Sequence, residues 1–502
     1  MVRRGLEVTA DSLAKKRRIA SRWLTPTERE LLDSLPGEAA HDLADSVIAK
    51  HRPNVVPFDG PPAPAPFTDG GDGPPLKLPK SRKVKPLAAP RTGDWRALLT
   101  SSENDRGDVT TRPTAHNVAV IVAFHPAWAG VLAFDERQAA PVFLKPPPFA
   151  AHYSAQNPAP CPRRVTDADA TRIRAWLEVA ELLTVRPDEV RAGVLVASQR
   201  ACFDPVKVYL SALVWDGVAR LDTWTVDYLG AKDTPYTQAV SARWMLSAVA
   251  RAFEPGCKAD VALVLEGAQG GGKSSAIKAL VPNLAWFADE LADLRSKDAA
   301  LGLAGKWIVE LAELAALGRA DLEVMKSFFS RSVDHFRPPF AVSAEDYPRR
   351  CVFGGTTNAT AYLRDETGAR RFWPLPVGAI YHADLARDRD HLWAEAVARY
   401  RAGEKWFLWE PELLSAAEEE QEARYVVDEW EQSIGEWLDA PVNAVKHEFS
   451  VADVLSGALK IDGARHDQIS QNRAVRALVR LRWTLHQRRT DGRRYRVYVR
   501  PR

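Results

Sequence analysis

The stretch VALVLEGAQGGGKSSAIKAL, residues 261–280, decides the fold of the central part of this chain. Its first seven residues are almost continuously apolar, which is typical of a buried parallel strand. Its last seven, SSAIKAL, are typical of a helix. Between them GAQGGGKS, residues 267–274, matches the pattern GxxxxGK[ST]. Strand, glycine-rich loop and helix in this order predict a loop whose backbone amides bind phosphate groups.

The spacing assigns a task to each part of this loop. Glycine lets the backbone amides turn toward phosphate oxygens. Lys273 would place its charge on the β- and γ-phosphates of a nucleotide, and Ser274 would offer its hydroxyl to Mg²⁺. A chance glycine turn is the alternative, but it leaves the flanking strand and helix unexplained. We therefore predict an ATP and Mg²⁺ site with the binding residues Gly267, Gly270, Gly271, Gly272, Lys273, Ser274 and Ser275.

Two later apolar runs end in polar residues suited to hydrolysis. In GKWIVELAEL, residues 305–314, an apolar lead-in precedes Glu310 and Glu313. One acid can hold Mg²⁺, for which we name Glu310, and the other can polarise the attacking water; which glutamate is the base stays open. An amphipathic helix start with two solvated acids is the alternative. In RCVFGGTTNAT, residues 350–360, Asn358 can position the lytic water, although such an Asn is more often a turn residue.

A pair of arginines follows in LRDETGARRFWPLP, residues 363–376. An arginine projected from a subunit edge can neutralise charge in a neighbour's site. Arg370 and Arg371 are the candidates. The alternative is a salt bridge to Asp365 or Glu366, and the pair can divide the two roles.

These motifs, together with VWDGVARLDTW and WFADELADLRSKDAALGLAG, resemble the virulence-associated E family of phage and genomic-island proteins over about residues 203 to 376. That family is similar to the superfamily-3 helicases within the AAA+ ATPases. The resemblance implies a Walker A loop at 267–274, an acidic Walker B region at Glu310 and Glu313, and a sensor at Asn358. In superfamily-3 enzymes the acids are often adjacent, whereas here they are three apart. The catalytic set is Lys273, Glu310, Glu313, Asn358, Arg370 and Arg371.

The resemblance also implies a hairpin that reaches DNA in the pore of a ring. The matching interval is EVMKSFFSRSVDHFRPPFAVSAEDYP, residues 323–348. Its candidate DNA contacts are Lys326, Arg331, His335 and Arg337, with Phe336 near enough to touch a base. The alternative is that Phe336 and Pro338 close a turn.

The flanking regions suggest further domains. We expect a largely disordered basic, Pro-rich region over 1–92 with a short helix, a mixed but mainly helical α/β domain over 93–235, the ATPase over 236–410, and a helical connector with a winged-helix-like domain over 411–502. The fold class is thus α/β, with an AAA+-type P-loop core on a parallel sheet. Thr166 or Asp167 should cap a helix, and Trp215 and Trp224 should be core residues beside a turn at Gly217.

The C-terminal segment is strongly basic. From Gln471 to Arg502 there are eleven arginines and one acid, Asp491. A helix at 472–482 and a hairpin around TDG predict DNA contacts. The alternatives are a solvated basic face and a docking surface for an acidic partner. The candidate DNA-binding residues are Arg473, Arg476, Arg480, Arg493 and Arg494.

Composition bounds the remaining possibilities. The formal charge of the chain is only +3, and its four cysteines form no CxxC pair, so neither a zinc knuckle nor a disulfide framework is indicated. No apolar run approaches the roughly 20 residues of a membrane span, and we expect a cytoplasmic location.

We therefore expect a DNA-dependent ATPase: a ring-forming, hexameric replicative helicase of a phage, phage satellite or other mobile element that moves on single-stranded or forked DNA with replication partners. The alternative is a P-loop switch or defence module that oligomerises on nucleotide without unwinding DNA. A third possibility is an assembly protein whose ATP site is structural.

Overall fold

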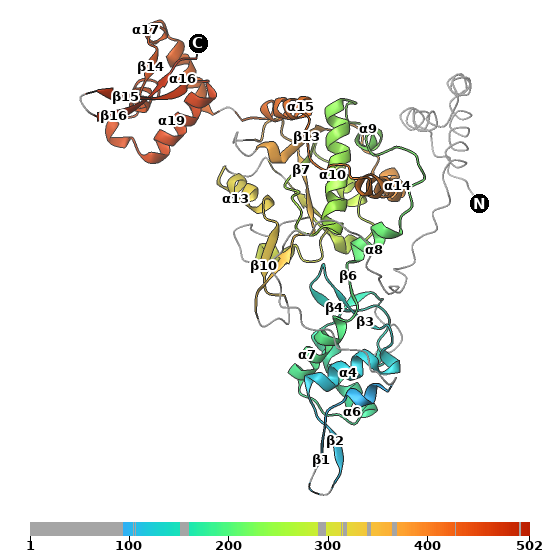
Figure 1. Cartoon of the computed structure of the whole chain (residues 1–502). Helices are drawn as coiled ribbons and strands as arrows, with labels where there is room; N and C mark the ends of the chain where they lie inside the picture. The colour runs from blue at the N-terminus through green and yellow to red at the C-terminus, as the bar shows by residue number, and fades with distance from the viewer. Residues whose placement is uncertain are drawn as a thin grey trace, which may run out of the picture. The chain divides into compact units, whose positions relative to one another are not determined.

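The computed structural model of the chain describes residues 94–103, 105, 107–150, 160–289, 298–312, 314, 319–338, 343–363, 369–426, 428–490 and 493–501. The predicted N-terminal region, 1–92, lies outside them. The chain folds as two compact units, which Figure 1 draws in colours that follow the sequence. The first unit comprises the chain to Asn358 and Arg370–Glu418. The second comprises Ala359–Ala369 and Glu419–Arg502.

The first part of the larger unit combines helices with a small sheet of strand order β5-β4-β3-β6. Thr166 caps α6, because its hydroxyl accepts a hydrogen bond from the Asp169 amide and the Asp169 carboxylate accepts one from the Thr166 amide. Of Thr166 and Asp167, the two residues predicted as the cap, Thr166 is therefore the one that caps the helix. The elements are η1 (Trp95–Leu98), β1 (Ser101–Glu103), β2 (Val109–Thr111), α4 (Ala115–Phe124), η2 (Pro126–Trp128), β3 (Leu132–Asp135), β4 (Ala140–Phe143), β5 (Arg163–Arg164), α6 (Asp167–Ala180), α7 (Pro187–Ser198), β6 (Cys202–Phe203) and α8 (Pro205–Ala212).

A five-stranded parallel sheet forms the centre of the same unit, which confirms the predicted α/β class. Its order in space is β13-β7-β12-β9-β8, so β7, the strand before the glycine loop, lies between two parallel neighbours. The carboxyl ends of all five strands therefore meet at one edge. The strands are β7 (Ala262–Glu266), β8 (Phe287–Ala288), β9 (Ile308–Leu311), β12 (Val352–Thr357) and β13 (Phe372–Pro376).

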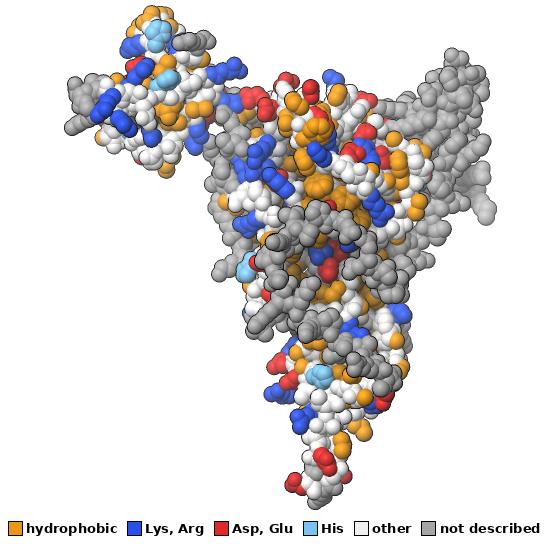
Figure 2. Space-filling view, in the orientation of Figure 1, with side chains coloured by type: hydrophobic (Ala, Val, Ile, Leu, Met, Phe, Trp, Pro, Cys, Tyr) orange, Lys and Arg blue, Asp and Glu red, His pale blue; other side chains and the backbone are white. Residues whose placement is uncertain are grey.

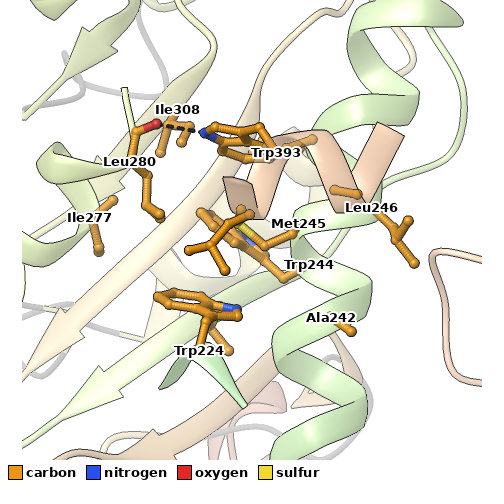
Figure 3. Close-up of a cluster of buried hydrophobic side chains, with 14 of the residues drawn as sticks. Trp224, Ala242, Trp244, Met245, Leu246, Ile277, Leu280, Ile308 and Trp393 are labelled. Atoms are coloured by element: carbon orange, nitrogen blue, oxygen red, sulfur yellow. Dashed lines mark hydrogen bonds between the residues drawn. The ribbon is translucent and has the colours of Figure 1, made fainter. Parts of the chain in front are cut away.

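Buried tryptophans join the helices to this sheet (Figure 3). The indole N–H of Trp244 donates to the carbonyl of Phe353 in β12 at 2.7 Å. The indole N–H of Trp393 donates to the carbonyl of Leu280, just past α11, at 2.8 Å, the dashed line in Figure 3. Because each ring is apolar and each N–H has a partner, these side chains fix the helices without a buried unsatisfied donor. The helices are α9 (Trp224–Leu229), α10 (Pro235–Phe253), α11 (Lys273–Ala279) and α14 (His382–Arg401).

Of the two tryptophans predicted to be core residues, only Trp224 is one, with 1% of its surface exposed. Trp215 is 38% exposed, and that prediction was wrong. Its indole N–H donates to the carbonyl of Val218 at 3.0 Å across the turn at Gly217, whose φ is +80°. The ring thus closes a surface turn instead of packing into the core.

A two-stranded antiparallel hairpin, β10 (Val333–Phe336) and β11 (Glu345–Pro348), follows helix α13 (Arg319–Phe329). Arg349 at its base is 2% exposed. Its Nε donates to Asp334 Oδ2 at 2.8 Å, its Nη1 donates to the carbonyl of Phe328, and its guanidinium carbon lies 4.4 Å from the centre of the Phe328 ring. A buried arginine with these partners ties the hairpin to the end of α13.

Removing Asp334 should therefore destabilise the protein strongly. Asp334→Ala leaves the buried Arg349 without its counter-ion, which costs about 3–5 kcal/mol of unfolding free energy. His335→Ala is the matched control, because His335 and its partner Asp346 on the same hairpin are both 66% exposed. An exposed pair contributes about 1 kcal/mol or less. Urea denaturation of both variants measures the difference, and equal losses would contradict the assigned role of Arg349.

The second unit packs helices against the three-stranded antiparallel sheet β14-β16-β15. Its core gathers Ile434, Leu478, Trp483 and Tyr498. Ser450 caps α18 through a capping box with Asp453. Its elements are α16 (Glu429–Asp439), α17 (Pro441–Ala444), β14 (Glu448–Phe449), α18 (Val451–Gly457), η6 (Gly463–Arg465), α19 (Gln468–Arg480), β15 (Thr484–Thr490) and β16 (Arg493–Val499), and α15 (Pro411–Glu422) leads into it.

Within the described ranges, no helix is both long enough and apolar enough to cross a bilayer.

Candidate functional site

The glycine loop leaves the end of β7, in the interior of the parallel sheet, and leads into α11. Gly270 and Gly272 have φ values of +75° and +85°, which residues with a Cβ rarely adopt. The loop is tied to the neighbouring strand, because the Gly267 amide donates to the carbonyl of Thr357 at 3.2 Å. The sequence therefore needs glycine here for the backbone course itself.

Lys273, the first residue of α11, folds back over this loop. Its Nζ donates to the carbonyls of Gly267 at 2.8 Å and Ala268 at 2.7 Å, and the residue is only 9% exposed. Neutral carbonyls are weak partners for an ammonium group compared with a phosphate. The ammonium is thus held at the loop in a position where an anion can compete for it. Ser274 and Ser275 follow in the first turn of α11, and both are exposed.

Glu310 lies in β9 and is 2% exposed. Its Oε1 accepts a hydrogen bond from the hydroxyl of Thr356, in the adjacent strand β12, at 2.8 Å. Among the described side chains, no lysine or arginine forms an ion pair with it. A buried carboxylate is costly without a counter-charge. Carboxylate oxygens are also preferred ligands of Mg²⁺, so this group fits a bound divalent cation.

Glu310 lies on the same face of the sheet as the helix that begins with Lys273. In the strand register Glu310 stands opposite Gly354, and Thr356 is two residues further on the same face. A Cβ on Gly354 would meet Ile277 Cδ1, in α11, at 3.1 Å. The absence of a side chain at Gly354 therefore lets α11 lie close over the strands that carry Glu310 and Thr356.

The other residues predicted to act in hydrolysis differ in their exposure and in their contacts, and some lie outside the described residues. Asn358 directly follows Thr357, whose carbonyl binds the first glycine of the loop, and it is exposed. Glu313 lies outside the described residues. The Nε and Nη2 of Arg371 donate to Ser330 Oγ at 3.2 and 2.8 Å, and Nε lies 3.7 Å from Asp260 Oδ2. Arg370 is exposed. Asp365 and Glu366, the predicted alternative partners, lie outside the described residues.

The residues predicted to contact DNA from the hairpin also differ in exposure and in their partners. Arg331 and Arg337 are exposed, and His335 pairs with Asp346 at 2.8 Å. Lys326 is 7% exposed within α13, and this burial gives no support to a direct DNA contact. Phe336 is 8% exposed and stacks on Tyr347 with ring centres 4.5 Å apart. Its ring therefore packs within the hairpin, contrary to the prediction that it touches a base.

The sequence did not point to Thr356 or Arg349. Thr356 became visible only through the pairing of β9 with β12, and Arg349 only through its burial against Asp334. A hydroxyl at the end of an apolar strand is a weak signal, and the dipeptide at 349–350 carries no sign that one arginine is buried.

Comparison with known proteins adds the family. Residues 210–426 match the model of the virulence-associated protein E-like domain. A search of curated proteins found no significant match. Among solved structures, an apo structure of the NrS-1 C-terminal region is 14% identical, with 58% of this chain and 78% of that chain covered and a TM-score of 0.36. Another apo structure of that region is 10% identical, with 74% and 96% covered and a TM-score of 0.34.

The family match spans the sheet, the glycine loop, Glu310 and both arginines of the 370–371 pair. The match of residues 210–426 to the virulence-associated protein E-like domain supports the predicted resemblance to the virulence-associated E family.

Proposed function

We propose that this chain is a P-loop ATPase with an AAA+-like core that uses ATP to move on DNA. The observation that carries the proposal is the presence of two charged groups on one side of the parallel sheet. One is Lys273, held at a positive-φ glycine loop by two carbonyls. The other is Glu310, a buried carboxylate that accepts a hydrogen bond from the neutral hydroxyl of Thr356.

In this proposal the chain's own groups bind and orient the nucleotide. The amides of the loop and the ammonium of Lys273 contact the phosphates, and Lys273 exchanges its two carbonyl partners for phosphate oxygens. Ser274 and Glu310 would hold Mg²⁺, which supplies charge neutralisation at the phosphates. Asn358 orients the attacking water, and Glu313 is the remaining candidate for the general base.

DNA is the proposed partner of the same unit, through the exposed Arg331 and Arg337 beside and on the β10–β11 hairpin. A hexameric ring of a phage or another mobile element, acting in replication, is the form that the family resemblance favours.

The test of the proposed function is unwinding of a fluorescently labelled forked duplex by the purified chain with ATP and Mg²⁺. We expect strand separation that requires ATP. Turnover of ATP without strand separation would favour a nucleotide switch instead.

Arg370, rather than Arg371, is the arginine we assign to a neighbouring subunit's site, because Arg371 already contacts Ser330 and Asp260. Arg370→Ala should lower ATP turnover by about 10³-fold or more. Mixing Arg370→Ala with Lys273→Ala subunits should restore part of the activity, because an intact Lys273 site then faces an intact Arg370. Full activity of Arg370→Ala alone, or no recovery on mixing, would contradict a role between subunits.

A further inference from the structure

The charges of the C-terminal unit are segregated along the chain. Residues 419–470 contain twelve acidic and four basic residues, whereas residues 471–502 contain eleven arginines and one aspartate. In Figure 2 the part of the molecule at the C-terminus, found by its label in Figure 1, shows many blue side chains. Which of these arginines are neutralised within the unit decides where a polyanion can bind.

Two arginines of helix α19 are neutralised by the acidic segment. The guanidinium of Arg473 binds both carboxylate oxygens of Asp428, at 2.8 and 2.6 Å, and lies 4.2 Å from the ring centre of Trp430. Arg480 pairs with Glu422 and lies 3.5 Å from Glu431. Each also holds α19 to the segment before α16. The helical spacing predicted a DNA contact for Arg473, Arg476 and Arg480. Two of these three, Arg473 and Arg480, thus form ion pairs within the unit.

The β15–β16 hairpin carries arginines that the acidic segment does not reach. Arg489 stands directly opposite Arg494, and Gln487 opposite Arg496, so the three arginines share one face of the hairpin. All three are exposed, and within the described residues none forms a side-chain hydrogen bond or ion pair. Like charges directly opposite each other destabilise a strand pair. An anion bound to this face would relieve that repulsion.

The opposite face of the same hairpin is different. Arg488 donates to Glu448 Oε2 at 2.9 Å, and its cross-strand neighbour is Tyr495. Arg493 stands opposite Thr490, and its side chain lies outside the described residues. Among the described side chains of the hairpin, those of Arg489, Arg494 and Arg496 combine exposure with uncompensated charge, and we call their face the wing face.

We propose that the wing face binds the phosphate backbone of double-stranded DNA. The proposal rests on DNA as the partner in the proposed function, but not on ATP turnover. Proteins that bind single strands add aromatic side chains on which bases stack. The aromatic residue on the wing face, Tyr498, is 4% exposed and packs into the core of the unit. A two-stranded ribbon also fits the major groove of duplex DNA.

The experiment measures binding of the full chain to a labelled duplex by fluorescence anisotropy at several salt concentrations, without nucleotide. Each neutralised phosphate contributes about 0.9 to the slope of log K against log salt. The triple variant Arg489→Gln, Arg494→Gln, Arg496→Gln should therefore lose about 2 to 3 from that slope, and Arg494→Gln alone about 1.

Arg488→Gln is the matched control, because that arginine is on the other face and is already paired; its slope should equal that of the parent. The triple variant should melt at the same or a higher temperature, since the cross-strand repulsion is gone. An unchanged slope in the triple variant, or an equal loss in the control, would overturn the proposal. So would weaker binding confined to single-stranded DNA. Loss of ATP turnover in the parent protein would affect only the proposed function, because this assay contains no nucleotide.

Discussion

Lys273→Ala should abolish ATP hydrolysis by this chain. Lys273 is nine-tenths buried and directs its ammonium to the carbonyls of Gly267 and Ala268, where the phosphates of a nucleotide would replace them. Removing one preorganised donor to a developing charge costs about 10²–10³ in rate. We expect a loss of at least that size, together with weaker binding of a fluorescent ATP analogue, measured as turnover of phosphate and as anisotropy.

Lys278→Ala is the control for this prediction, since Lys278 lies on the same helix but is exposed. It should keep the parent rate. The fold should survive in both variants, because the two carbonyls that lose Lys273 lie in a loop within reach of water, and a lost hydrogen bond of this kind costs about 1 kcal/mol. Turnover by Lys273→Ala at the rate of the parent would mean that the glycine loop is not the nucleotide site.

Glu310→Gln should separate nucleotide binding from turnover. The amide can still accept the hydrogen bond from Thr356, so the strand pairing is kept, but it lacks the negative charge that a divalent cation needs. We expect turnover to fall by about 10²–10³-fold, with nucleotide binding retained. In metal-free buffer the variant should unfold at the same or a higher temperature, because the charge removed is buried and lacks a cationic partner among the described residues.

Thr356→Val provides a graded comparison for Glu310. It removes the hydroxyl that positions the carboxylate but leaves the charge, so its loss of turnover should be smaller than that of Glu310→Gln. Isothermal titration with Mg²⁺ and a non-hydrolysable ATP analogue compares the three proteins. Full turnover by Glu310→Gln would exclude Glu310 as the metal-binding acid and would leave Glu313 as the remaining candidate from the sequence.

The sequence predicted those parts of the fold that depend on local patterns. The apolar run before Gly267 and the glycine spacing require a strand, a loop with positive φ and a helix, and β7, Gly270, Gly272 and α11 agree. A helix cap at Thr166 or Asp167 was predicted for the same reason, and Thr166 is the cap, with its partner Asp169 three residues further on. Such features involve neighbours along the chain, and their physics can be read from a short window.

Features that depend on distant pairing could not be predicted in this way. Thr356 lies 46 residues from Glu310, and their contact follows from the register of β9 on β12. Arg473 lies 45 residues from Asp428, so helical spacing alone showed a basic row without showing that it is partly neutralised. The same limit explains Trp215, whose apolar surface suggested the core while its N–H closes an exposed turn.

The most direct test of the account is ATP hydrolysis by the purified chain with and without single-stranded DNA, in parallel with Lys273→Ala. We expect hydrolysis that DNA stimulates and that disappears in the variant. Hydrolysis that is indifferent to DNA would contradict a DNA motor and favour a nucleotide switch. Absence of hydrolysis in the parent protein, with and without DNA, would contradict the assignment of Lys273 and Glu310 to a working ATPase site.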